Sequence, residues 1–309
     1  MKKYYIITLL LLLSNTFHGF SQDCEIHLMS VISDTDNRTP ENAKQFMQNR
    51  LEAIINSDGI SATSNYAQFF ITSKSTVLSE QTLATAPPKT SLVLSLDLYI
   101  GDAWGEKVFA QTSIELRNVG NSREQAYLAA YRTLNKSNKA LSEFIKTGKQ
   151  KIINYYDTEY PNILKEADRY AQMKDFDRAI YLLSVVPACC KGYNASTEKM
   201  LEIFQTYIDL QNHKILQQAK MAWAASPDKH GAEKAGEYLG QIEPYAACFD
   251  EAMNLYQEIK EKVKSDWDFE MKQKYSDEIE LKKLKIEAAK AIGVAFGNNQ
   301  KAHTTNLLN

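Results

Sequence analysis

The sequence predicts an α+β fold: an antiparallel-leaning sheet with helices on one face, followed by an all-α helical repeat domain and a long carboxy-terminal helix. Hydrophobic residues alternate without a break over 92–100 and again over 108–116, which indicates two strands with one buried face each. From Asp157 onward such alternation is absent, and apolar residues recur at helical spacing. Strands followed by a run of helices are typical of an α+β chain or of two domains.

The first 21 residues have the features of a secretory signal peptide. Lys2 and Lys3 precede an apolar run from Tyr4 to Leu13, and Gly19 and Ser21 put small residues at both specificity positions of a cleavage site. The apolar run is too short to cross a bilayer as a stable helix. We therefore expect residues 1–21 to be removed, leaving a periplasmic or secreted chain with no transmembrane segment.

The charge balance argues against a nucleic-acid partner. The net charge is −2, and it becomes −4 once the two lysines of the signal peptide are removed. The chain has no long run of one sign, whereas nucleic-acid binding depends on clustered Lys and Arg. With 44% hydrophobic and 24% charged residues, the composition is that of a globular protein, and the length suits about two domains.

Residues 22–150 are predicted to form the α+β domain, in the order strand, helix, three strands, helix. Thr39 and Pro40 begin the first helix as N-cap and first helical residue, and Ser122 with Gln125 forms a capping box before the second. The expected elements are a strand at 24–32, a helix over 39–54, strands at 66–83, 92–100 and 108–116 with a hairpin loop at 101–105, and a helix over 122–145.

This order of elements, with an extended hairpin followed by Ser122, Gln125, Ala126 and a helix, resembles the amino-terminal domain of TolB and related periplasmic domains of secretion and assembly lipoproteins. The resemblance is limited to the first domain and rests on the pattern of elements. It implies a periplasmic interaction domain without catalysis.

Residues 151–265 resemble tetratricopeptide repeats (TPR). Ala167 is the small residue where two helices approach, Tyr170 follows one turn later, Asp175 and Phe176 form a turn, and Ala179 opens the second helix. The resemblance implies helix pairs that stack on their neighbours. We expect the boundary between the two domains near residue 150, in a segment that proteases would cut between residues 147 and 161.

A short internal repeat of the sequence, which we call the echo, independently predicts two stacked units. Leu182, Val185 and Pro187 recur 57 positions later (182 to 239) as Leu239, Ile242 and Pro244, and cysteines follow both sets. Since neither unit can close a core alone, they should stack, with the carboxy-terminal helix covering an exposed end. An apolar residue at every fourth position from Leu255 to Ile279 predicts that this helix runs on unbroken, with 266–309 as its continuation and polar tail.

No catalytic, cofactor-binding or metal-ligating residue is expected. The sequence has no Gly-x-Ser-x-Gly and no phosphate-binding glycine loop. The histidines of the mature chain are not spaced three or four residues apart, which argues against a zinc site: His27, His213, His230 and His303.

The cysteines belong to an exported chain, so disulfides can persist. Cys24 is not preceded by a lipobox, and we expect it to be unlipidated. The echo puts Cys248 at a position like that of Cys189 and Cys190, which predicts a disulfide from Cys248 to one of them; buried free thiols are the alternative.

The expected function is that of a non-enzymatic periplasmic adaptor or scaffold that binds an envelope protein or peptide through the helical repeat surface. Trp104, in the hairpin loop, could anchor a partner or fold back over the sheet. One alternative is a subunit of a cell-envelope secretion or surface assembly. Another is an exported hydrolase or enzyme accessory, with a site built from scattered carboxylates such as Asp97 and Asp102.

Overall fold

The structure is a computed structural model of the full chain. It describes the residues 26–32, 39–57, 68–102, 107–135, 137–264 and 267–299. The predicted signal peptide, Cys24 and Trp104 lie outside these described residues.

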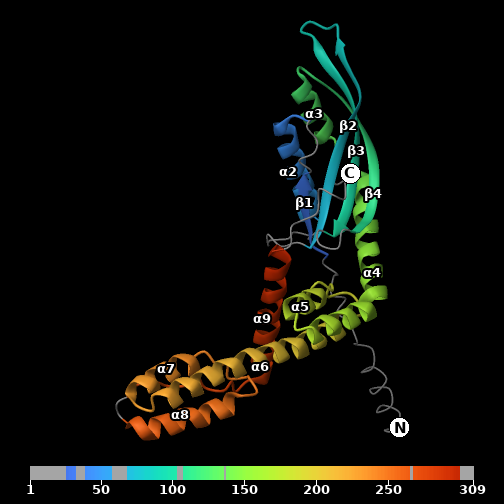
Figure 1. The fold of residues 1–309 in the computed structure, drawn as a ribbon. Coiled ribbons are helices and arrows are strands. Elements are labelled where there is room, and N and C mark those ends of the chain that lie inside the picture. The colour runs from blue at the N-terminus through green and yellow to red at the C-terminus, as the bar shows by residue number, and fades with distance from the viewer. Residues whose placement is uncertain are drawn as a thin grey trace, which may run out of the picture.

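The described strands form one mixed sheet in the order β1-β2-β3-β4, as expected for the α+β class. β1 (Leu28–Ile32) pairs in parallel with the start of β2 (Phe69–Leu83), and β3 (Lys89–Asp102) pairs antiparallel with both β2 and β4 (Lys107–Gly120). The β2–β3 hairpin extends well past the helices at one end of the sheet (Figure 1).

The core of this half lies on one face of β3. Five alternating side chains of β3 are fully buried there, and they pack with α2 (Glu41–Ser57), α3 (Arg123–Arg132) and the first part of α4 (Lys139–Gln172). The residues between them, such as Asp97, belong to the other face and lie outside the core cluster. The predicted alternation is therefore confirmed in these five residues: Leu92, Leu94, Leu96, Leu98 and Ile100.

The helix predicted over 122–145 is divided into α3 and α4. Ser122 caps α3 as expected, because its side chain accepts a hydrogen bond from the Gln125 N–H at 3.2 Å. A second cap was missed: the Asn138 side chain accepts from the Leu141 N–H at 3.1 Å and starts α4. Between the two helices, the Leu134 carbonyl accepts from Arg50 Nε of α2, which satisfies backbone that a continuous helix would have paired internally.

α4 runs for 34 residues through the segment that we predicted to be an interdomain linker. The expectation of a break between residues 147 and 161 is wrong, because Gly148 and Pro161 both lie inside the helix. Gly148 serves close packing here: a Cβ at this position would lie 2.5 Å from Cδ1 of Ile100 on β3. Tertiary packing along the whole length of α4 outweighs the local stop signals.

The helical half is built along two long helices. α4 is followed by α5 (Phe176–Ser184), α6 (Tyr193–Ala225), α7 (Lys229–Leu239), α8 (Phe249–Val263) and α9 (Glu278–Asn299). One core joins the end of α4, α5, the start of α6 and α9, and a further core joins the end of α6 with α7 and α8. Figure 1 shows α6 running away from the sheet with α7 and α8 at its far end, while α9 returns toward the sheet.

The long carboxy-terminal helix is present, but it does not continue α8. α8 ends at Val263, the segment 267–277 is not helical, and α9 begins at Glu278. Asp277 starts α9, since its Oδ1 accepts from the N–H groups of Ile279 and Glu280 at 2.8 and 3.1 Å. The break lets α9 fold back against α5 and α6.

The contact of Gly148 with Ile100 can be tested by a double-mutant cycle. Ile100→Val removes the Cδ1 atom that a Cβ at residue 148 would meet. We expect Ile100→Val to lower the free energy of unfolding by about 1 kcal/mol less in a Gly148→Ala background than in the wild type. In the Gly148→Ala background the smaller valine relieves the overlap with the new Cβ. Urea unfolding of the four proteins measures this difference. Equal costs in both backgrounds would show that α4 does not rest on Ile100 at this point.

Candidate functional site

The turn between α5 and α6 recurs between α7 and α8. In the first turn the N–H groups of Cys190 and Tyr193 each donate to the carbonyl three residues earlier, both at 3.0 Å. In the second turn Ala246 and Phe249 make the same two bonds, at 2.9 and 3.0 Å. Equivalent residues of the two turns therefore lie 56 positions apart (190 to 246).

Each turn is also held by a carboxylate from the preceding long helix. Asp157 of α4 accepts a hydrogen bond from the Lys191 N–H at 2.7 Å, and Asp209 of α6 accepts from the Ala247 N–H at 2.8 Å. Lys191 and Ala247 are again 56 positions apart. Asp157 and Asp209 are themselves 52 positions apart, so Asp209 lies one helical turn earlier than the offset of 56 would place it. The hydrogen bonds thus relate two similar units: α4 end–α5–α6 start, and α6 end–α7–α8.

The predicted echo was displaced by one residue. Its offset of 57 aligned Pro187 with Pro244, but in the structure Pro244 takes the place of Ala188. A proline can occupy either of two adjacent positions in this turn, so the two prolines were a poor guide to register. At the offset of 56 the buried positions coincide, as in the pairs Ala179 and Ala235, Leu183 and Leu239, Val186 and Ile242, and Ile203 and Ile259.

The predicted disulfide from Cys248 is wrong. Cys190 and Cys248 are free thiols, and Cys189 is disulfide-bonded, but to neither of them. Cys190 packs into the core of the sheet, whereas Cys248 belongs to the far core beside α7 and α8. At the corrected offset Cys248 is the equivalent of Gly192, so the repeat does not bring the cysteines together.

A polar cluster closes the end of the sheet next to the helical half. Asp102 of β3 is 6% exposed, and its carboxylate accepts from Gln68 at 3.0 Å and from the Tyr156 hydroxyl of α4 at 3.4 Å. Burial, followed by the negative charge of Asp102, raises the pKa of Tyr156 well above its ordinary value, and the same two causes raise the pKa of Tyr181 on α5. These hydroxyls therefore stay protonated, so that Tyr156 can donate to the carboxylate.

The two carboxylates named for a hydrolase do not form one site. Asp97 is on the opposite face of β3 from Asp102, where it accepts from the hydroxyls of Ser95 and Ser113. Asp102 is instead buried at the junction described above. An acid and a base acting on one substrate would have to reach the same atoms, and these two cannot.

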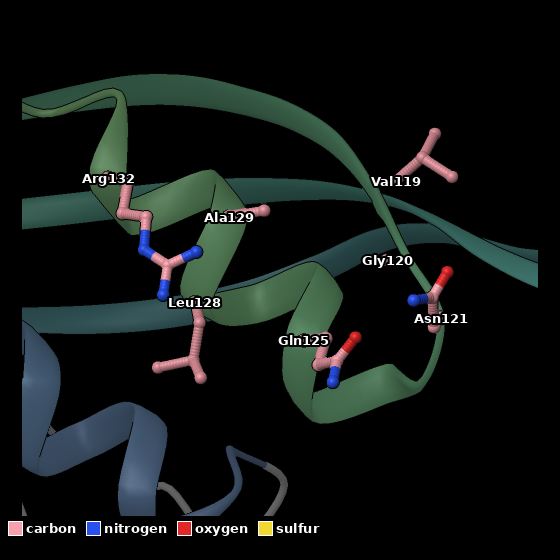
Figure 2. A pocket seen from close by; sticks show the side chains of 7 residues that line it. All are labelled: Val119, Gly120, Asn121, Gln125, Leu128, Ala129 and Arg132. Carbon is pink, nitrogen blue, oxygen red and sulfur yellow. The ribbon is translucent and has the colours of Figure 1, made fainter.

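A hollow of about 410 Å³ lies between the end of β4 and α3, at a place that the sequence did not indicate. Figure 2 shows the side chains that line it. Gln125, Leu128 and Arg132 line it from successive turns of α3, so the wall is mixed polar and apolar. The Arg132 guanidinium also lies 5.7 Å from the Phe46 ring of α2. The remaining lining residues are Val119, Gly120, Asn121 and Ala129.

A second hollow, of about 560 Å³, lies on the outer face of α7, and we call it the α7 hollow. Its floor carries Gly236 and Gly240, and the rings of Trp267 and Phe269 form one wall. Its other lining residues are charged: Lys229, Glu233, Glu237 and Asp268. Gly236 in α7 and Gly240 at its C-cap, four residues apart, are the trace of this site in the sequence.

Neither a metal-binding cluster nor a membrane-spanning helix is present among the described residues. Within them, no group of three or more His, Cys, Asp or Glu side chains is placed to hold a metal ion. No helix among them is both long and apolar enough to cross a membrane. Trp104, the residue proposed to anchor a partner, lies outside the described part of the chain.

No protein-family model matches the chain, and no curated protein matches it. Among solved structures, it is similar to a crystal structure described as a "putative lipoprotein from Caulobacter crescentus", at 12% identity over 40% of this chain and 88% of that chain. The TM-score is 0.25, so this likeness carries no argument about fold or function. The resemblances to TolB and to tetratricopeptide repeats are not confirmed by these comparisons.

Replacing either turn-binding carboxylate should destabilise the chain. We expect Asp157→Ala and Asp209→Ala each to lower the free energy of unfolding by about 1 kcal/mol, because a turn N–H loses a charged acceptor. The Asn variants should lose less, since the amide oxygen still accepts. Glu143→Ala, an exposed acid on α4, is the control. Urea unfolding measures all five variants, and equal effects of Asp209→Ala and Glu143→Ala would contradict a structural role of Asp209.

The two free thiols, Cys190 and Cys248, are both buried, and burial raises the pKa of each. Burial, followed by the charge of Asp157, raises the pKa of Cys190 to about 12, so its reactive thiolate is scarce at pH 8. We expect iodoacetamide to spare Cys190 in the folded chain. After unfolding in urea without reductant, it should label both Cys190 and Cys248, as peptide mass mapping would show. A disulfide-linked peptide that contains Cys248 would contradict this assignment.

Proposed function

We propose that the chain is an exported, non-enzymatic adaptor or scaffold that binds an envelope protein or peptide through its helical half. The observation that supports this most directly is the repeated unit along α4, α6 and α8. Stacked units of this kind present a continuous surface by construction, because each unit contacts mainly its neighbours. The signal-like first 21 residues support export to the periplasm or beyond.

Exposed apolar side chains also favour the helical half as the binding surface. Among the described large apolar residues, the three most exposed are Met173, Met221 and Ile279, at 68%, 63% and 70%. All three belong to the helical half. Flexible methionines suit a surface that adapts to a partner. In this proposal the α+β half sets the position of the array within a larger assembly, a role that the continuous helix α4 would transmit.

The test compares two matched triple variants of the full mature chain in cross-linking and pull-down from the native envelope. One variant carries Met173→Ser, Met221→Ser and Ile279→Ser. The control carries the same number of exposed apolar-to-serine changes in the sheet: Leu78→Ser, Val108→Ser and Val119→Ser. We expect the amount of partner recovered with the helical variant to fall at least fivefold, since a few apolar anchors dominate most interfaces. The amount recovered with the control should not change.

Circular dichroism of both variants confirms that they are folded before the comparison. Loss of the partner in the sheet variant alone would place the binding surface on the α+β half. Retention by both variants would show that exposed apolar side chains of the helical half do not carry binding. A fragment starting at residue 151 is unsuitable for this test, because it would cut α4 and uncover the core that Ile145 and Ile152 share.

A further inference from the structure

The two repeat units differ in what covers their short helix. At the offset of 56, Ser184 of α5 corresponds to Gly240 of α7, Tyr181 to Glu237, and Asp177 to Glu233. The outer face of α5 and the outer face of α7 are thus equivalent surfaces. The segment that covers the outer face of α5 therefore indicates what kind of ligand the outer face of α7 can bind.

The face of α5 is covered by a helix of the same chain. α9 approaches so closely that a Cβ on Gly293 would lie 2.5 Å from Oγ of Ser184, and the ring of Phe296 lies 5.5 Å from that of Tyr181. Ala289 of α9 is fully buried in the same core. This unit therefore binds a polypeptide segment on the outer face of its short helix.

The equivalent face of α7 is covered only in part. A Cβ on Gly236 would lie 3.1 Å from the Trp267 ring, and one on Gly240 would lie 3.4 Å from Phe269. These two rings are stacked on each other at 5.2 Å. Two side chains thus occupy part of the place that a whole helix fills in the first unit, and the α7 hollow is the remainder.

The charges around the hollow favour a cationic occupant. Glu233, Glu237 and Asp268 stand against one ammonium group, that of Lys229. Nearby acids of the same region are neutralised, as in the pairs Glu243–Lys272, Glu270–Lys260 and Asp250–Lys274. By contrast, no ion pair within the described residues engages the three carboxylates of the hollow. The Trp267 ring is itself buried, at 7% exposed, and packs on Tyr256, so the accessible ring of this wall is that of Phe269. An aromatic ring beside carboxylates is a surrounding that arginine and lysine side chains prefer.

We propose that the α7 hollow binds a basic peptide segment of a partner protein, with an arginine or lysine beside the partly exposed Phe269 ring and near Glu233, Glu237 and Asp268. A neighbouring apolar side chain of the peptide would contact the glycine floor. The equivalent position of α9 on α5 argues for a polypeptide, and the charge and the rings argue for a basic one. This inference rests on the proposed function, because it names the kind of partner that the helical half would take.

The test is a calorimetric titration of the full mature chain with blocked eight-residue peptides. The probe alternates arginine and leucine, and in the comparison peptide glutamine replaces every arginine. We expect the arginine peptide to bind at least about tenfold more tightly, since each charged hydrogen bond to a carboxylate contributes strongly. In the double variant Glu233→Gln, Glu237→Gln, its affinity should fall by a similar factor.

A matched variant controls for the general charge of the chain. Asp177→Asn with Glu198→Gln removes the same charge from exposed positions on α5 and α6 of the first unit, and should leave the affinity unchanged. Equal binding of the two peptides, equal losses in both variants, or binding of spermidine as tight as that of the peptide would each overturn the proposal. So would the absence of binding at millimolar peptide.

This outcome can be separated from that of the proposed function. If the hollow binds no basic peptide but the helical triple variant still loses its envelope partner, the partner docks elsewhere on the helical half. If the peptide binds and the triple variant keeps its partner, the hollow is a site of its own, and the apolar side chains are not the docking surface.

Discussion

The structure depends on the sharing of two long helices between successive cores. The start of α4 packs on the sheet and its end packs on α5, while α6 joins the middle core to the far one. A helix is stiff over its length, so each core fixes the direction in which the next is built. This sharing explains why Pro161 is tolerated inside α4: both halves of the helix are held by packing on different partners.

The junction of the sheet with the helices is polar as well as apolar. Asp102 accepts hydrogen bonds from Gln68 and from Tyr156. Burial, followed by the negative charge of Asp102, also raises the pKa of Tyr181 on α5. A carboxylate is costly to bury unless its donors are in place, so the cluster favours one arrangement of β3, α4 and α5 over others. The junction therefore fixes the relation between the two halves, which the proposed adaptor function would require.

The two repeat units keep the same turn but differ on their outer faces. The turn is maintained by Asp157 and Asp209, which perform the same task from successive long helices. The first unit uses its outer face internally, against α9, whereas the second leaves part of that face to Trp267, Phe269 and a hollow. The open part of the second face is where we propose that a basic peptide binds.

The sequence by itself determined the α+β class, the order of the elements up to α3 and the existence of a repeat, because these depend on local periods and caps such as Ser122. Only the tertiary structure decided the continuity of α4 past Gly148, the break before Glu278 and the register of the repeat. The reason is that packing between distant residues overrides local signals in the first two cases and sets the register in the third. The α7 hollow could not be predicted from the sequence either, because only the tertiary structure brings Trp267 into contact with α7.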